Sequence, residues 1–180
     1  MDILGALLIL VTLSPLMIRV AILIVMLQGT PVFFRHARLG KSNQEFGILK
    51  FCTMSNKLNG DGELLPDEDR VSAIGQFLRR TSIDEIPGFW KVLRVQMSMV
   101  GPRPLSTQYL GRYSKEQAKR HHLKPDVTGW AQINGRNAIT WEKKFLLDVW
   151  YVDNQSLLLD LKILILTIKY VLLRRGIVPD

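Results

Sequence analysis

The chain has little cysteine and little histidine. Cys52 is its single cysteine, so an intramolecular disulfide framework is excluded. The three histidines and Cys52 show no spacing typical of a zinc site, which argues against the common zinc-binding modules. A chain without disulfides fits a reducing compartment, and we therefore expect the folded part of the chain to face the cytosol.

Acidic residues are scarce relative to basic ones. The 180 residues include 24 Lys and Arg against 16 Asp and Glu, a formal net charge of +8. This surplus favours polyanionic partners, namely nucleic acid, anionic lipid headgroups or phosphorylated substrates. The basic residues form no long basic helix or finger pattern, and no aromatic stacking motif accompanies them. We therefore expect no nucleic-acid partner.

Internal repeats are absent and the length suits about one domain, but apolar residues gather at the two ends. Residues 3–27 are apolar except at Thr12, Ser14, Pro15 and Arg19. A run of this length can cross a bilayer, which needs ~20 residues. Because no basic segment precedes it and no small-residue cleavage site ends it, we expect a retained membrane segment rather than a signal peptide.

Pro15 makes a straight spanning helix unfavourable. It removes a backbone donor and clashes with the preceding turn, while the Ser14 hydroxyl can bond a freed backbone group. Arg19 would be costly at the bilayer centre but tolerable near the headgroups of a bent helix. A helix that enters, turns and leaves on one face therefore competes with a spanning helix. In either case the positive-inside rule places the next domain in the cytoplasm, because basic residues follow closely: Arg35, Arg38, Lys41 and Lys50.

The middle of the chain predicts short strands and helices. Residues 31–34 and 46–51 read as strands around the polar turn 40–43, and residues 56–69 as a surface loop. Helical patterning returns at residues 71–80.

Two further helices complete the predicted fold. Pro87 suits the first position of a helix over residues 87–93. Residues 157–173 form an amphipathic helix, which suits either a membrane interface or a packed core. We expect an α+β, mostly helical fold, with a membrane helix at residues 1–30 and a catalytic domain at residues 31–180.

Asp84 and Glu85 form an acidic pair that could carry chemistry. Ser82 and Glu85 also match a capping box, in which the pair would only stabilise a helix start. Pro87 disfavours that alternative, because a cap at Ser82 would put the proline inside the helix. If Pro87 opens the helix instead, both carboxylates lie beside its positive end, where phosphate also binds.

Basic elements accompany this pair. Arg103 stands between two prolines in Gly-Pro-Arg-Pro, a rigid setting that suits bidentate phosphate contact. Gly135 permits an unusual turn, after which Arg136 and Asn137 offer donors to an anion. Further arginines near the acidic pair are Arg79, Arg80 and Arg94.

Several long motifs resemble one family. Residues 78–105, with Ser-Ile-Asp-Glu-Ile-Pro and Met-Ser-Met-Val-Gly-Pro-Arg-Pro-Leu, resemble the bacterial sugar transferases, the monotopic phosphoglycosyl transferases. The resemblance covers nearly the whole chain, and residues 135–145 are most similar to the initiating enzyme of bacterial N-linked glycosylation. Other matching segments, in the family's order, are Arg35 to Gly40, Lys50 to Met54, Gly62 to Pro66, Gly129 to Asn137 and Trp141 to Phe145.

The resemblance implies a reaction. In this family the aspartate, here Asp84, attacks the β-phosphate of a UDP-sugar and UMP leaves, after which the phosphosugar passes to polyprenol (undecaprenyl) phosphate. The family uses Mg²⁺, which Asp84 would bind, and Glu85 would assist the nucleophile or the acceptor. The product starts the membrane stage of glycoconjugate assembly. The residues carried over as donor or phosphate contacts are Lys50, Arg79, Arg103, Arg136 and Asn137.

The resemblance also implies a location. It predicts a re-entrant membrane helix broken at Ser14-Pro15, which contacts membrane lipids and holds the enzyme on the cytoplasmic face of the bacterial inner membrane. No motif names the sugar, the polyprenol length or the oligomeric state.

Some positions depart from the family pattern. Cys52 replaces a usual basic residue and Asp126 a usual glycine. Gly88, Lys91 and Gln96 alter the stretch that usually reads Pro-Gln-Leu-x-Asn-Val-Leu-x-Gly-Asp-Met. None of these changes removes the acidic pair or the Gly-Pro-Arg-Pro element.

The main alternative is a catalytically inactive, membrane-anchored scaffold, whose arginines would only hold lipid headgroups or phosphate. Turnover separates it from an enzyme. The adjacent His121 and His122 are expected on the surface or in an acceptor-side loop.

Overall fold

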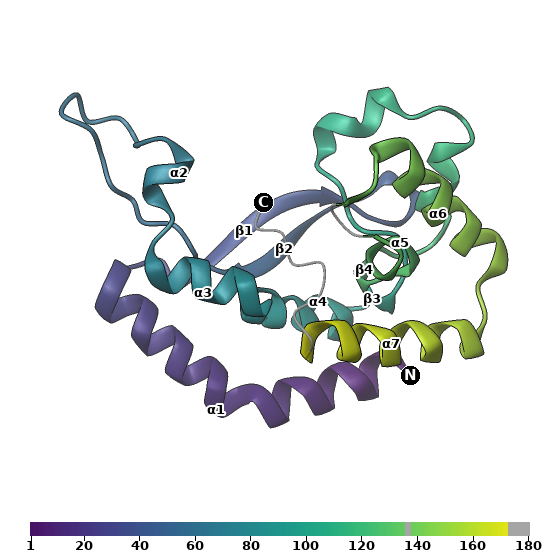
Figure 1. Cartoon of the computed structure of the whole chain (residues 1–180), viewed down its shortest axis with the longest axis horizontal. Helices are drawn as coiled ribbons and strands as arrows, with labels where there is room; N and C mark the ends of the chain where they lie inside the picture. The colour runs from purple at the N-terminus through teal and green to yellow at the C-terminus, as the bar shows by residue number, and fades with distance from the viewer. Residues whose placement is uncertain (136–137, 173–180) are drawn as a thin grey trace.

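The computed structural model describes residues 1–135 and 138–172. It confirms an α+β, mostly helical fold, in which a long N-terminal helix and a β-hairpin are followed by short elements and two longer helices (Figure 1). In chain order the elements are α1 (Asp2–Gln28), β1 (Phe33–Leu39), η1 (Lys41–Asn43), β2 (Glu45–Phe51), α2 (Asp67–Arg70), α3 (Ala73–Thr81), η2 (Ile83–Gly88), α4 (Phe89–Leu93), β3 (Ser98–Val100), η3 (Thr107–Arg112), η4 (Gln117–His122), β4 (Asp126–Thr128), α5 (Trp130–Ile133), α6 (Trp141–Asn154) and α7 (Leu157–Leu172).

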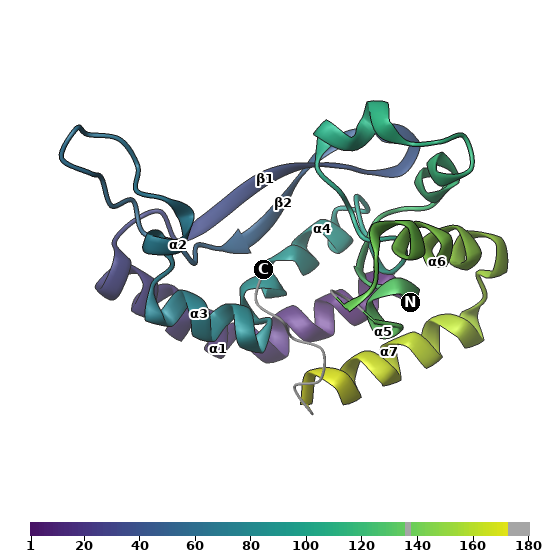
Figure 2. The ribbon, with the colours of Figure 1, turned by 45° about the horizontal axis from the view of Figure 1, so that its top comes forward.

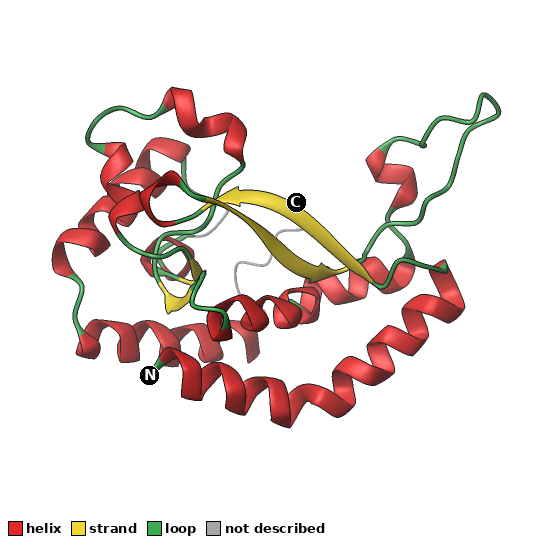
Figure 3. Cartoon of the chain, turned by 180° about the vertical axis from the view of Figure 1, so that it is seen from behind, coloured by secondary structure: helices red, strands yellow, loops and turns green. Residues whose placement is uncertain are grey.

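Helix α1 is bent near its middle, as Pro15 predicts (Figure 3). Proline has no N–H to donate to the carbonyl of Val11, four residues earlier. The Ser14 hydroxyl donates to that same carbonyl oxygen at 2.8 Å, so the freed acceptor is satisfied inside the helix. The helix is therefore continuous through Ser14-Pro15, bent rather than interrupted.

Most of α1 is exposed although it is strongly apolar. It is long and apolar enough to cross a membrane by length and composition, yet only 11% of its most apolar window is buried against the rest of the chain. Ala6, Val20 and Ile24 are its buried residues. A contiguous exposed apolar surface of this kind is typical of a membrane or protein interaction site.

The hairpin of β1 and β2 is antiparallel, with Phe33 opposite Phe51 and Leu39 opposite Glu45. The predicted hairpin is confirmed, but its first strand begins at Phe33 and continues to Leu39. Most of β1 is exposed, so it carries no alternation of buried and exposed positions from which its length could be predicted.

Two apolar clusters form the core, and α1 contributes to both. Ala6 packs with Met99, Tyr151 and others in the first cluster. Val20 and Ile24 pack with Phe51 and others in the second cluster. The predicted membrane helix is thus also part of the wall of the folded domain.

Helix α7 is apolar on most of its surface rather than amphipathic as predicted: Asp160 and Thr167 bond the folded domain through Tyr151 and Thr128, and Lys162 and Lys169 are the exposed polar residues among those described. Ile163 is fully buried in the first cluster, whereas Leu158, Ile165 and Ile168 on other faces are 79%, 66% and 61% exposed. Figures 1 and 2 show α7 beside the N-terminal half of α1, away from the hairpin. One side of the molecule therefore combines two exposed apolar helical surfaces.

Strands β3 and β4 pair in parallel, with Ser98 opposite Asp126 and Val100 opposite Thr128. A side chain at Gly129 would place its Cβ 2.0 Å from the carbonyl oxygen of Gly101. Only glycine permits this approach, which holds the Gly-Pro-Arg-Pro segment against the chain after β4.

Candidate active site

The acidic pair lies in the 3₁₀ helix η2, between α3 and α4. Ser82 has a left-handed backbone (φ 55°), which ends α3 and starts η2. Asp84 and Glu85 fall in the first turn of η2, and Pro87 lies inside it. The prediction that Pro87 opens an α-helix was wrong: α4 begins two residues later, because the short 3₁₀ turn accommodates the proline.

The capping-box alternative is excluded by the hydrogen bonds. The Ser82 side chain makes no capping hydrogen bond to η2, and its backbone N–H donates to the carbonyls at the end of α3. The Ser82–Glu85 pair therefore forms no capping box, and the Glu85 carboxylate pairs with basic side chains instead.

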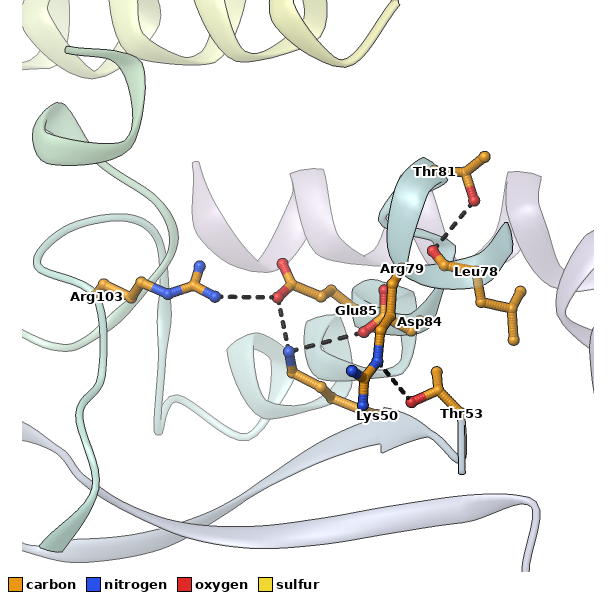
Figure 4. Close-up of polar contacts among 8 residues, drawn as sticks. All are labelled: Lys50, Thr53, Leu78, Arg79, Thr81, Asp84, Glu85 and Arg103. Carbon is orange, nitrogen blue, oxygen red and sulfur yellow. Dashed lines mark hydrogen bonds and ion pairs between the residues drawn. The ribbon is translucent and has the colours of Figure 1, made fainter. Parts of the chain in front are cut away.

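Glu85 contacts two cations from different parts of the fold (Figure 4). Lys50 in β2 donates from Nζ to Glu85 Oε1 at 2.7 Å, and the same nitrogen lies 3.8 Å from Asp84 Oδ2. Nη2 of Arg103, from the Gly-Pro-Arg-Pro segment, lies 3.4 Å from Glu85 Oε1. Residues far apart in the sequence thus meet around the pair.

Arg79 approaches from the last turn of α3. Its Nε donates to the Thr53 hydroxyl at 3.0 Å, which fixes the guanidinium beside the acidic pair. A Cβ at Gly75 would lie 1.9 Å from the Thr53 carbonyl oxygen, so this glycine allows α3 to approach the chain after β2. Arg79 is close enough to lower the pKa of Asp84.

Asp84 is a buried carboxyl with a perturbed pKa. Burial and the neighbouring charge of Glu85 raise its pKa to about 6, while Lys50 and Arg79 oppose the rise. Asp84 is therefore ionised at neutral pH but poorly solvated. A carboxylate in that state is a stronger nucleophile than one on the surface.

The site can contribute few ligands to a metal ion. Among residues 1–135 and 138–172 there is no group of three or more His, Cys, Asp or Glu side chains that could hold one. Mg²⁺ commonly binds through one or two carboxylates together with substrate phosphates rather than in a closed protein cage. Asp84 and Glu85 fit that partial ligand set.

Residues 1–174 match the family described as bacterial sugar transferase. The chain belongs to the bacterial sugar transferase family. It is 55% identical over 149 residues to the uncharacterized sugar transferase EpsL of Bacillus subtilis (strain 168), a match that spans 83% of this chain and 74% of the relative. It is 37% identical over 194 residues to the exopolysaccharide production protein ExoY of Sinorhizobium fredii, spanning 97% of this chain and 85% of the relative.

A third relative is named for its reaction. The UDP-glucose:undecaprenyl-phosphate glucose-1-phosphate transferase of Xanthomonas campestris pv. campestris is 38% identical over 166 residues, spanning 85% of this chain and 34% of the relative. These matches confirm that the protein is a transferase enzyme, as the motifs implied.

The structure of this sugar transferase brings together three of the predicted contact residues. Lys50, Arg79 and Arg103 all lie at the acidic pair. The predicted contacts Arg136 and Asn137 lie outside the described residues.

The departures from the family pattern are accommodated locally. The Cys52 thiol donates to the Met54 carbonyl oxygen at 3.3 Å. Lys91 donates to the Gln96 side chain at 3.2 Å, within one turn at the end of α4. The Gln132 amide donates to Asp126 at 2.8 Å, where Asp126 replaces the usual glycine of this sugar transferase family.

Sequence reasoning missed a buried charged group behind the site. Arg120 and Asp148 are 3% and 3% exposed and form an ion pair at 2.6 Å. His121 is also buried, with Nδ1 at 3.3 Å from the Gly40 carbonyl oxygen, so the prediction of a surface position was wrong for His121. Consecutive basic residues usually indicate a surface, and the acid that pairs with Arg120 is 28 residues away.

Proposed function

We propose that the protein transfers a sugar-1-phosphate from a UDP-sugar to undecaprenyl phosphate, through a covalent intermediate on Asp84. The observation that carries this proposal is the buried Asp84 carboxylate, with Lys50 and Arg79 beside it and Arg103 at the neighbouring Glu85. Relatives named for UDP-glucose or UDP-galactose and a lipid carrier support the substrate classes.

The reaction uses one nucleophile twice. A carboxylate oxygen of Asp84 attacks the β-phosphorus of the donor, the bond from that phosphorus to the bridging oxygen breaks, and UMP leaves. A phosphate oxygen of the acceptor then attacks the same phosphorus, and the bond to Asp84 breaks. The carboxylate is restored, and the products are UMP and a polyprenyl-diphosphate sugar.

Cations are needed because the nucleophile and the donor are both anionic. Lys50 and Arg79 lie close enough to offset charge on Asp84, and Arg103 can reach a phosphate beside Glu85. Mg²⁺, held by Asp84 and Glu85 when bound, supplies further charge neutralisation on the diphosphate. Glu85 would accept the proton of an acceptor phosphate that arrives as the monoanion.

The apolar surfaces support a monotopic attachment to the membrane. Bent α1 has apolar residues exposed on both sides of Pro15, among them Leu8 and Ile22. We propose that α1 enters and leaves the cytoplasmic face of the bacterial inner membrane as a re-entrant helix. The exposed face of α7 would lie on the same surface.

The pathway served by the product is open to a direct test. Residues 135–145 resemble the initiating enzyme of N-linked glycosylation, whereas relatives are named for exopolysaccharide production or for UDP-glucose transfer. A panel of donors, including UDP-glucose, UDP-galactose and a UDP-diacetamido sugar, decides between these alternatives.

The test measures UMP release by the purified full chain with Mg²⁺, undecaprenyl phosphate and each UDP-sugar. We expect release with at least one donor, and its loss in Asp84→Asn. The control is Asp69→Asn, which alters an exposed acid on α2 and should leave the rate unchanged. Undiminished release by Asp84→Asn would contradict the role of Asp84 as nucleophile.

A second measurement looks for the intermediate itself. When acceptor is omitted, one phosphosugar mass should appear on the peptide that contains Asp84. Its absence with every active donor would favour direct transfer in a ternary complex. No turnover with any donor would favour the inactive scaffold.

A further inference from the structure

Arg120 is a buried arginine directly behind the Gly-Pro-Arg-Pro segment. Its Nη2 donates to the Arg103 carbonyl oxygen at 2.6 Å and to Asp148 Oδ2 at 2.6 Å. Its Nη1 donates to the Tyr113 hydroxyl at 3.3 Å. The guanidinium therefore touches the backbone of the residue whose side chain reaches Glu85.

The geometry differs from that of an ion pair that serves stability alone. An arginine and a carboxylate usually pair through two parallel N–H donors, which uses both carboxylate oxygens. Here a single nitrogen, Nη2, is divided between Asp148 and the Arg103 carbonyl. The position of the carboxylate thus sets the position of the carbonyl.

Asp148 is a buried acceptor that holds the Arg120 guanidinium. It lies in α6, is 3% exposed, and packs against η4, which carries Arg120. The rings of Phe145 and Tyr113 lie 5.5 and 5.8 Å from Arg120 Cζ. Aromatic rings at these distances attract a guanidinium and restrict its movement.

Backbone hydrogen bonds of the neighbouring residues also hold the segment around Arg103. Gly101 N–H donates to the Thr128 carbonyl at 3.1 Å, and Asp126 N–H donates to the Pro102 carbonyl at 3.2 Å. Prolines on both sides restrict the backbone of Arg103. The bond from Arg120 restrains the Arg103 carbonyl itself, and with it the direction in which the Arg103 side chain leaves the backbone.

We propose that Arg120, held by Asp148, is a positioning residue for Arg103. It fixes the Arg103 backbone so that the guanidinium meets the diphosphate of the donor beside Glu85. This inference rests on the proposed function, in which Arg103 contacts that diphosphate. A shift of about 1 Å in such a group can lower a rate about a hundredfold. Arg120 can therefore affect the rate although it does not touch the substrate.

The test is a double-mutant cycle between Arg120 and Arg103. Arg120→Lys keeps the positive charge, but its ammonium lacks the rigid planar fork that joins the three acceptors. We expect at least a tenfold loss in kcat for UMP release and a severalfold weaker binding of UDP, measured by calorimetry. In the Arg103→Ala background, the same Arg120→Lys substitution should lower neither kcat nor the affinity for UDP much further.

The matched control is Tyr151→Phe, a substitution in α6, the helix that carries Asp148. Tyr151 is fully buried, and its hydroxyl donates to Asp160 Oδ1 at 2.6 Å, without a contact to Arg103. This variant lowers thermal stability, but its small effect on UDP binding should be the same with and without Arg103. Asp148→Asn, which keeps an acceptor for Arg120, is a second variant and should resemble Arg120→Lys in milder form.

The outcomes separate the two proposals. Equal losses from Arg120→Lys with and without the Arg103 side chain would mean a purely structural role and overturn the inference. Another outcome is that the unaltered enzyme releases no UMP while the double-mutant cycle measured by UDP binding gives the expected result. That outcome would refute the proposed reaction but leave Arg120 as the positioning residue for Arg103. Absence of UDP binding by the unaltered enzyme would refute both.

Discussion

Replacing Asp84 by asparagine should stabilise the protein while removing its activity. Burial and Glu85 raise the pKa of Asp84 from 3.8 to about 6. Because the folded state then disfavours the ionised carboxylate, folding is opposed wherever that carboxylate is ionised. Asparagine has a similar shape and no charge, and Lys50 keeps its 2.7 Å contact with Glu85.

The size of the effect follows from the pKa difference. A shift of about two pKa units corresponds to about 3 kcal/mol, because each unit is worth about 1.4 kcal/mol. Well below pH 3.8 the carboxyl is protonated in both the folded and the unfolded state, so the cost is absent. It grows as the pH rises from about 4 to about 6 and is complete above that.

The assay is thermal unfolding of the full chain in detergent at pH 4 and pH 7.5. For a protein of this size, about 3 kcal/mol corresponds to an increase in Tm of about 6–12 °C, expected for Asp84→Asn at pH 7.5 and reduced to roughly a fifth of that at pH 4. Glu85→Gln is the control, because it loses ion pairs with Lys50 and Arg103 and should not stabilise. An equal gain at both pH values, or none at pH 7.5, would refute the electrostatic reasoning.

Three other perturbations test separate parts of the structure. Lys50→Met removes a charge that lowers the pKa of Asp84, so the acid limb of the pH profile of UMP release should move above its original midpoint near pH 6. Gly75→Ala forces a Cβ to within 1.9 Å of the Thr53 carbonyl oxygen and should lower the free energy of unfolding by about 1–3 kcal/mol, measured in denaturant. Pro15→Ala restores a backbone donor and should straighten α1, so a thiol label near residue 1 should become reachable from the periplasm.

Each of these perturbations has a control or a contradicting result. Lys57→Met changes an exposed lysine and should leave the pH profile in place. Gly60→Ala meets no atom within 4 Å, so a loss as large as that of Gly75→Ala would contradict the packing argument. Periplasmic labelling of the unaltered chain would contradict a re-entrant helix.

Local patterns predicted much of the fold and part of the site. The apolar run with Pro15 predicted a long bent helix, and the pattern of residues 157–173 predicted a helix there, although its exposed face is more apolar than expected. Motifs predicted that Lys50, Arg79 and Arg103 serve one site, and the structure brings all three to the acidic pair. The fold predictions succeeded because each depends on a short stretch of sequence, whereas the roles of these three cations stay predictions.

Features that depend on distant contacts could not be predicted. The 3₁₀ conformation of η2 depends on the left-handed backbone of Ser82, and serine gives no local signal for that conformation. The pairing of Arg120 with Asp148 depends on how η4 meets α6. A basic run such as the one that contains Arg120 and His121 is otherwise typical of a solvated surface.

Because α1 supplies residues to both apolar clusters, the order in which the enzyme is made and inserted has a consequence. Until Ala6, Val20 and Ile24 are in place, each cluster lacks one wall, so the chain after residue 30 cannot complete its core alone. Helix α1 precedes the other residues of both clusters in the chain, so it leaves the ribosome before them and can enter the lipid while they are being made. Under the proposed function, assembly of the acidic site is thereby linked to arrival at the membrane, where a lipid acceptor would lie.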